Sequence, residues 1–144
     1  MKKISRSAIV EHSAAFMYGL VEDIEAYPAF LPWCLEAQVL EREGGSTQAR
    51  LTAGLGALRQ SFTTQNRNRP GEAIEMRLLE GPFRHFDADW RFQPLGPDAS
   101  QVEFSLEYEF SSRALGKLLQ PLFDHVADTM VDAFIRRADQ VDAR

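Results

Sequence analysis

The sequence predicts an α+β fold in which a seven-stranded antiparallel sheet curls around one long C-terminal helix. Residues 35–110 alternate between apolar and polar side chains, a pattern typical of strands that bury one face. The residues after 112 carry apolar side chains every three or four positions, which indicates an amphipathic helix. A further strand and a shorter helix precede the alternating region. The predicted order is therefore strand, helix, six strands and helix.

Composition restricts the class of protein. The chain has 144 residues, with 16 Lys and Arg against 21 Asp and Glu. This length fits a single domain, 1–144, and the 15 aromatic side chains require a core. No apolar run is long enough to cross a membrane and no secretory signal opens the chain, so we expect a cytoplasmic protein. The acidic pI, about 5.2, argues against DNA and bulk nucleic-acid binding.

The N-terminal elements are a strand and a helix that Ser13 caps. Phe16, Leu20 and Ile24 recur at helical spacing, so we expect them to share the buried face. The helix is expected to end at Tyr27, because the residue before a proline is disfavoured in the α region.

Six strands follow, separated by short turns that contain Gly or Pro. The last helix is expected to begin near Ser112 and to kink or break at Pro121. A single helix, about 10–12 Å across, does not fill the concave side of seven strands. We therefore expect an apolar cavity between helix and sheet. The inner faces of the best-patterned strands carry Ala49, Leu51 and Ala53; Ile74, Met76 and Leu78; Phe86, Ala88, Trp90 and Phe92; and Val102, Phe104, Leu106, Tyr108 and Phe110.

Catalytic and metal-binding patterns are weak. His12, His85 and His125 lie on different elements at no ligand spacing, so we predict no metal site. The single cysteine, Cys34, excludes an internal disulfide and has no base placed beside it. The stretch 54–56, Gly-Leu-Gly, lacks the third glycine of a dinucleotide fingerprint and is interpreted as a turn. We therefore predict that the protein is not an enzyme.

Residues 27–34 combine two prolines with Tyr, Phe, Leu and Trp. One interpretation is a loop that folds over an end of the core. A second, compatible interpretation is the rim or gate of a pocket. Exposed aromatic side chains in this loop also suggest peripheral contact with the inner membrane.

Five segments carry a resemblance to a known family: Tyr27-Pro-Ala-Phe-Leu-Pro-Trp-Cys34, Leu58-Arg-Gln-Ser-Phe-Thr-Thr-Gln-Asn66, Glu80-Gly-Pro-Phe-Arg-His85, Trp90-Arg-Phe92 and Ala133-Phe-Ile-Arg-Arg-Ala138. They resemble the bacterial coenzyme Q-binding family, which also contains the ribosome association toxin RatA. The resemblance covers nearly the whole chain. It implies the START-like helix-grip fold of the polyketide cyclase and lipid-transport superfamily.

The resemblance implies two functions, of which we expect the first. In the first, the protein is a carrier or chaperone that holds ubiquinone or a similar polyprenyl lipid in support of respiration, and it has no other cofactor. Large apolar side chains are expected to surround the ligand, and Tyr108 is expected to donate the one hydrogen bond to a quinone carbonyl. The expected ligand-binding residues are Tyr27, Phe30, Leu31 and Trp33 at the mouth; Phe62, Met76, Trp90 and Tyr108 on the sheet; and Leu119, Phe123 and Met130 on the helix.

The alternative is a RatA-like toxin that binds the large ribosomal subunit and blocks subunit association. Arg59, Arg67 and Arg69 would then contact RNA phosphates, although they also fit a solvated strand. Members of the family often carry a basic residue in the turn at 54–56, and its absence here disfavours this alternative. A cyclase-type enzyme is the third possibility, which needs titratable groups inside the cavity. The alternation places few there.

Overall fold

The computed structural model describes residues 1–142; the last two residues of the predicted domain, 143 and 144, lie outside the described part. The strands form one seven-stranded antiparallel sheet in the order β1-β7-β6-β5-β4-β3-β2. The predicted fold class and order of elements are confirmed. The elements are β1 (Lys2–Val10), α1 (Ala14–Glu22), the 3-10 helix η1 (Ile24–Ala29), β2 (Cys34–Glu43), β3 (Ser46–Leu55), β4 (Leu58–Arg69), β5 (Ala73–Glu80), β6 (Phe83–Gly96), β7 (Ala99–Phe110) and α2 (Arg113–Val141).

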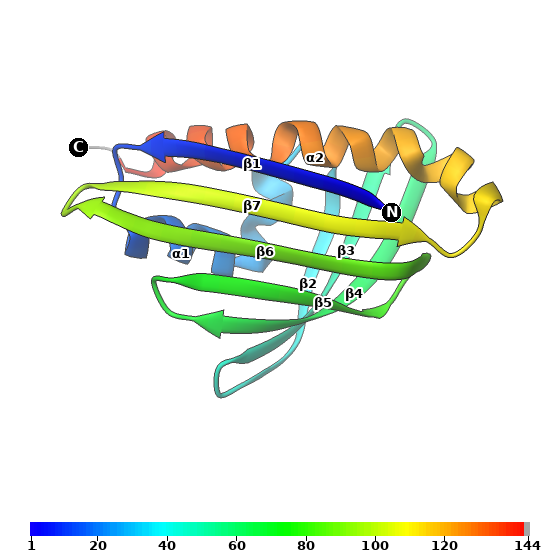
Figure 1. Ribbon diagram of the computed structural model, residues 1–144, viewed down its shortest axis with the longest axis horizontal. Helices are drawn as coiled ribbons and strands as arrows, with labels where there is room; N and C mark the ends of the chain where they lie inside the picture. Colours follow the sequence, from blue (N-terminus) through cyan, green and yellow to red (C-terminus); the bar gives the residue numbers. More distant parts are fainter. Residues whose placement is uncertain (143–144) are drawn as a thin grey trace.

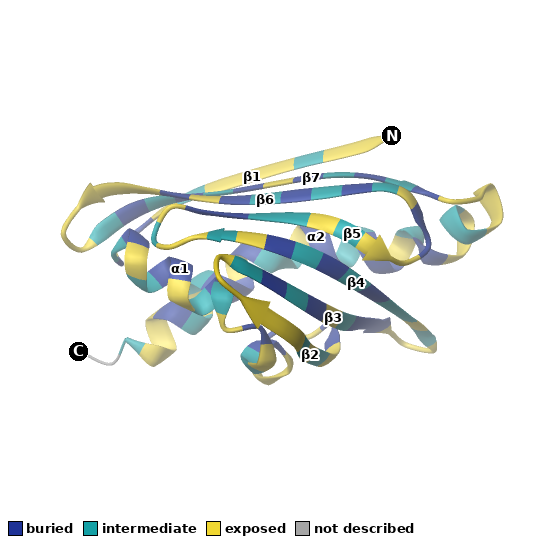
Figure 2. Cartoon of the chain, turned by 90° about the horizontal axis from the view of Figure 1, so that it is seen from below, coloured by how far each residue is buried: buried dark blue, intermediate teal, exposed yellow. Residues whose placement is uncertain are grey.

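The sheet is strongly twisted, and α2 lies along its concave face. Figure 1 shows β2, β3 and β4 running at a steep angle to β6 and β7. This is the right-handed twist that backbone sterics impose on strands. Along β6 and β7, buried side chains alternate with more exposed ones, as the banding in Figure 2 shows. The predicted inner faces of these two strands are therefore confirmed.

The long helix α2 is continuous, so of the kink or break expected at Pro121 the break is absent. The proline has no N–H to donate to the carbonyl of Lys117, four residues earlier. Both residues are exposed, so water reaches that carbonyl and the helix tolerates the lost hydrogen bond. The helix begins where predicted, because the Ser112 hydroxyl accepts a hydrogen bond from the backbone N–H of Leu115 at 3.2 Å.

Two predictions for the N-terminal helix are wrong. α1 ends at Glu22 and the 3-10 helix η1 follows, with Pro28 inside it. Phe16 and Leu20 are only partly buried, because α1 packs against β6 and β7 and also against α2. The buried side of α1 consists instead of Ala14, Met17, Tyr18 and Val21.

A polar network ties α2 to the β1–β7 side of the sheet. The Gln120 amide donates to the Tyr108 hydroxyl at 2.7 Å and to the Asp124 carboxylate at 2.8 Å. The Lys2 ammonium donates to the same carboxylate at 2.9 Å. This hydrogen bond lowers the pKa of Asp124 and raises the pKa of Lys2. The network fixes the position of the helix above the sheet.

His12 fastens the far end of α2. Its ring is buried between two carboxylates, with Nε2 at 2.7 Å from Asp139 and Nδ1 at 2.9 Å from Asp142. The ring also stacks on Phe16, with centroids 5.3 Å apart. Both ends of the helix are thus held to the N-terminal part of the chain.

Candidate ligand cavity

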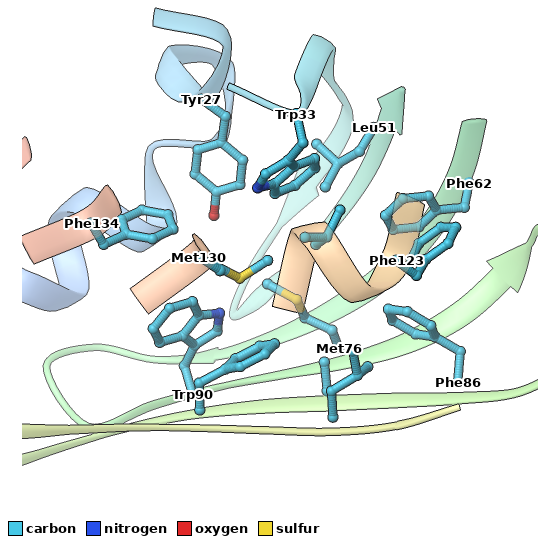
Figure 3. Close-up of a pocket in the computed structure, with 14 residues that line it drawn as sticks. Tyr27, Trp33, Leu51, Phe62, Met76, Phe86, Trp90, Phe123, Met130 and Phe134 are labelled. Carbon is cyan, nitrogen blue, oxygen red and sulfur yellow. The ribbon is translucent and has the colours of Figure 1, made fainter. Parts of the chain in front are cut away.

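An apolar cavity lies between α2 and the concave face of the sheet, with Tyr27 and Trp33 at one end (Figure 3). The space expected between helix and sheet is therefore present. Its walls come from η1 and the loop after it, from strands β3 to β7, and from α2. The lining residues are Tyr27, Trp33, Leu51, Phe62, Met76, Phe86, Ala88, Trp90, Phe104, Leu106, Phe123, Val126, Met130 and Phe134.

Strand register and helix spacing bring these side chains together. Leu51 and Phe62 are directly opposite each other in the β3–β4 ladder, as are Met76 and Ala88 in the β5–β6 ladder. Side chains opposite each other on one face of a sheet are close neighbours. On α2, the lining residues recur at spacings of three and four and so form one stripe. That stripe consists of Phe123, Val126, Met130 and Phe134.

The lining is almost entirely carbon and sulfur. Its only ionisable side chain among the described residues is Tyr27, whose hydroxyl donates a hydrogen bond to the Val21 carbonyl. Burial raises the pKa of this hydroxyl far above its usual range. The indole Nε1 of Trp33 is buried and has no hydrogen-bond partner within residues 1–142. The cavity therefore suits a neutral molecule.

The cavity is small. Its volume is about 40 Å³, whereas established ligand pockets measure roughly 300–1,000 Å³. Any ligand of more than a few heavy atoms must therefore displace side chains. The best candidates to move are Met76 and Met130, which are only partly buried and have flexible, unbranched side chains.

The structure places most, but not all, of the predicted ligand residues at the cavity. Their contact with a ligand remains a prediction. Those in the lining are Tyr27, Trp33, Phe62, Met76, Trp90, Phe123 and Met130.

Four predicted residues lie outside the lining. Tyr108 is buried against α2, and its hydroxyl accepts a hydrogen bond from Gln120, so it does not face the cavity as predicted. Phe30 packs on the other side of Phe134, with ring centroids 5.1 Å apart. Leu31 and Leu119 are buried in the surrounding core. For Tyr108 and Phe30, a contact with a neighbouring side chain, which the periodicity does not specify, accompanies this placement.

Seven lining residues were not among the expected ligand-binding residues. All seven carry a signal, because the strand members are themselves predicted inner-face positions and the helix members lie on the apolar stripe. They are Leu51, Phe86, Ala88, Phe104, Leu106, Val126 and Phe134.

The loop 27–34 closes over the core. Tyr27, Leu31 and Trp33 are at most 4% exposed, whereas Pro28 and Pro32 are exposed. The expected membrane contact depended on exposed aromatic side chains here; of the loop's aromatic residues only Phe30 is partly exposed, and the contact stays a prediction. None of the described helices is long and apolar enough to span a membrane.

The three predicted RNA-contacting arginines do not form one cluster. Arg67 and Arg69 lie at the end of β4, where they border an open depression together with Arg77 of β5. Arg59 is eight residues from Arg67 in the same strand, which at ~3.3 Å per residue places it roughly 26 Å away. Arg69 is also within 3.7 Å of Glu75, so part of its charge is balanced.

A charged group on the outer face of the sheet was not predicted. The β6–β7 register places Asp87 opposite Glu107, and the His85 Nε2 atom lies 3.3 Å and 3.7 Å from their carboxylates. Arg77 and Lys3 also contact these carboxylates, at 3.4 Å and 3.6 Å. The ligand atoms of His85, Asp87 and Glu107 lie within 4.8 Å of one another, close enough to hold a metal ion, so the absence of a metal site stays a prediction. The pairing of β5, β6 and β7 with one another and with β1 brings this charged group together.

Comparisons with known proteins agree with this architecture. Residues 10–135 match the family model described as polyketide cyclase / dehydrase and lipid transport. The ribosome association toxin RatA of Pseudomonas aeruginosa is 42% identical over 138 residues, which are 96% of each chain. The mitochondrial coenzyme Q-binding protein COQ10 homolog B of Xenopus laevis is 30% identical over 97% of this chain and 59% of its own length. The Zhui aromatase/cyclase from Streptomyces sp. R1128 has the same fold, with a TM-score of 0.85 at 18% identity over 99% of this chain and 96% of that one.

Proposed function

The chain belongs to the polyketide cyclase/dehydrase and lipid transport family, and on this premise we propose that it binds a neutral apolar molecule between α2 and the sheet. The ligand class that we favour is ubiquinone or a similar isoprenoid lipid, for which the protein acts as a carrier or chaperone. The observation that carries the proposal is the unfilled apolar cavity at the centre of the fold. The similarity to a protein named for coenzyme Q binding supports the same ligand class.

Ligand burial supplies the driving force. Apolar surface removed from water contributes about 25 cal/mol per Å², so 200 Å² of buried ligand surface contributes about 5 kcal/mol. Part of this free energy offsets the displacement of Met76 and Met130 that the small cavity requires. Met side chains suit this role, because they repack at low cost.

Organic extraction of the protein purified from a quinone-producing bacterium, followed by mass spectrometry, tests the proposal. We expect a neutral isoprenoid in near-stoichiometric amount. The variant Ala88→Leu adds three carbons to the cavity wall and is expected to lose the ligand, whereas Ala57→Leu, at the exposed β3–β4 turn, is expected to retain it. Circular dichroism confirms that both variants are folded. An empty extract, with no binding of added ubiquinone, contradicts the proposal.

A second candidate function is association with the large ribosomal subunit. It is supported by the relatives named for ribosome association and by the depression that Arg67, Arg69 and Arg77 border. Arginines on an open surface suit RNA phosphates, and such binding weakens steeply as salt concentration rises.

Sedimentation of ribosomal subunits with added protein distinguishes this candidate. Free subunits are expected to accumulate at low salt, and the double variant Arg67→Glu/Arg69→Glu is expected to abolish the effect. Arg59→Glu changes the net charge of the same strand away from the depression, and it serves as the control. Unchanged profiles with the unmodified protein at low salt rule this function out.

The cavity gives less support to cyclase chemistry. Such a reaction requires acids or bases that face the substrate. Among the described lining residues only Tyr27 is ionisable, and its proton is already donated to the Val21 carbonyl. The structural similarity to the aromatase/cyclase is therefore a similarity of fold.

A further inference from the structure

The indole of Trp33 carries a buried hydrogen-bond donor at the cavity that has no partner among the described residues. The side chain is 1% exposed and lines the cavity, yet its Nε1–H bonds to no described group. Figure 3 shows this nitrogen on the edge of the ring that faces Tyr27 and Met130, toward the interior. A buried donor without an acceptor destabilises the fold, and most buried polar groups in proteins avoid this cost by forming a hydrogen bond. A phenylalanine would fill similar space without it.

The neighbouring polar groups do not serve this nitrogen. The Tyr27 hydroxyl donates to the Val21 carbonyl, and the Tyr108 hydroxyl lies outside the cavity, where it accepts from Gln120. The Trp33 carbonyl is occupied by the backbone N–H of Gly54 at 2.8 Å, which fixes the backbone of this loop on β3. The indole is thus held in place while its donor remains free.

We infer that Trp33 Nε1–H is the hydrogen-bond donor that orients the ligand, and that the ligand carries a neutral carbonyl oxygen. This inference rests on the proposed binding of an apolar molecule. A carbonyl accepts the free donor and needs no counter-ion. A carboxylate or phosphate would be buried without a cation, because the described lining residues include no Lys, Arg or His, and the loss of hydration would oppose binding. Quinones, ketones and esters are therefore accepted, and fatty acids are excluded.

The side chain of Met130 controls access to this donor. Figure 3 shows it between Trp33 and Trp90, with its sulfur inside the cavity. Movement of this flexible side chain enlarges the cavity and uncovers the indole nitrogen at the same time. Ligand entry and formation of the hydrogen bond are therefore coupled.

A pair of ligands that differ only in their carbonyl groups tests the inference. Menadione and 2-methylnaphthalene share a ring skeleton, and only menadione carries oxygens. Trp33→Phe is expected to weaken menadione binding about tenfold, the loss of one hydrogen bond, and to leave 2-methylnaphthalene binding unchanged. Isothermal titration calorimetry measures both affinities. Incorporation of benzothienylalanine at position 33, which keeps the indole shape without the N–H, gives the same result if the donor is responsible.

A spectroscopic measurement separates orientation from packing. Bound menadione labelled with ¹³C at its carbonyl carbons is expected to show a lowered carbonyl stretching frequency, which returns to its free value in Trp33→Phe. Equal loss of affinity for both ligands, with no frequency shift in the unmodified protein, overturns the role of Trp33 and leaves apolar binding standing. Failure of the unmodified protein to bind either ligand overturns the proposed function itself.

Discussion

Replacement of Val126 by Ile is expected to stabilise the protein, which is unusual for a change in a packed core. Val126 is 4% exposed and lies on the stripe of α2 that faces the cavity. The extra methyl group needs about the space of one water molecule, roughly 10–15 Å³. The cavity volume is about 40 Å³. The methyl group therefore fits without strain.

The size of the effect follows from the transfer of one methylene group. Burial of a CH₂ contributes about 0.8 kcal/mol, and in a chain of this length that corresponds to a rise in Tm of roughly 2–3 °C. Urea denaturation and thermal unfolding by circular dichroism measure the change. The same substitution is expected to weaken binding of an apolar ligand, because it occupies the space that the ligand needs.

The matched control is Val131→Ile on the same helix. Val131 is 7% exposed but lies outside the cavity lining. An added methyl group there overpacks the core and is expected to cost about 1–3 kcal/mol. If both variants shift the stability in the same direction, the cavity is not space that a side chain can fill, and the argument from its volume is refuted.

Three further predictions concern features away from the cavity. Ser112→Ala removes the cap of α2 and is expected to lower the free energy of unfolding by about 1 kcal/mol in urea; no change would show that water replaces the cap. Asp124 has a lowered pKa because Lys2 donates to it, so its contribution is present above its unfolded pKa, about 3.9, and is lost as the pH falls through its folded pKa. Between pH 7 and pH 3 the free energy of unfolding is therefore expected to fall less in Asp124→Asn than in the unmodified protein, by under about 1 kcal/mol. Identical curves of stability against pH would contradict this. Burial raises the pKa of the Cys34 thiol to about 11, so at pH 8 a disulfide reagent is expected to modify it slowly in the native protein and rapidly in urea; rapid native modification would show that the loop opens.

The sequence was informative wherever one periodicity determines the burial of a whole element. The alternation in β6 and β7 predicts that Trp90 and Phe104 lie on the inner face, and the structure confirms this; the two residues are paired across the strands, with ring centroids 4.7 Å apart. The spacing on α2 likewise predicts that Phe123 and Met130 lie on its inner stripe. Both patterns arise from local geometry, which the sequence specifies directly.

Features that depend on contacts between distant elements were not predictable in this way. Tyr108 has the inward phase of a lining residue, but Gln120 of α2 reaches its hydroxyl and the cavity begins farther along the sheet. Phe30 belongs to an aromatic-rich loop, yet η1 turns it toward Phe134 and Arg137, whose guanidinium lies 5.2 Å from the ring centroid. Arg59 and Arg67 looked close in sequence, but an extended strand separates them.

The pairing of the first strand with the last sets the order in which this chain can fold. β1 aligns Lys2 with Tyr108 and Val10 with Ser100, whereas each of the strands β2 to β7 pairs with its sequence neighbour. The meander can therefore form progressively during synthesis, while β1 waits until β7 has left the ribosome. Contacts so distant in sequence slow folding, because the intervening loop must close before they form. The free edge of β7 is unpaired until then, so the nascent chain is most prone to aggregation late in its synthesis.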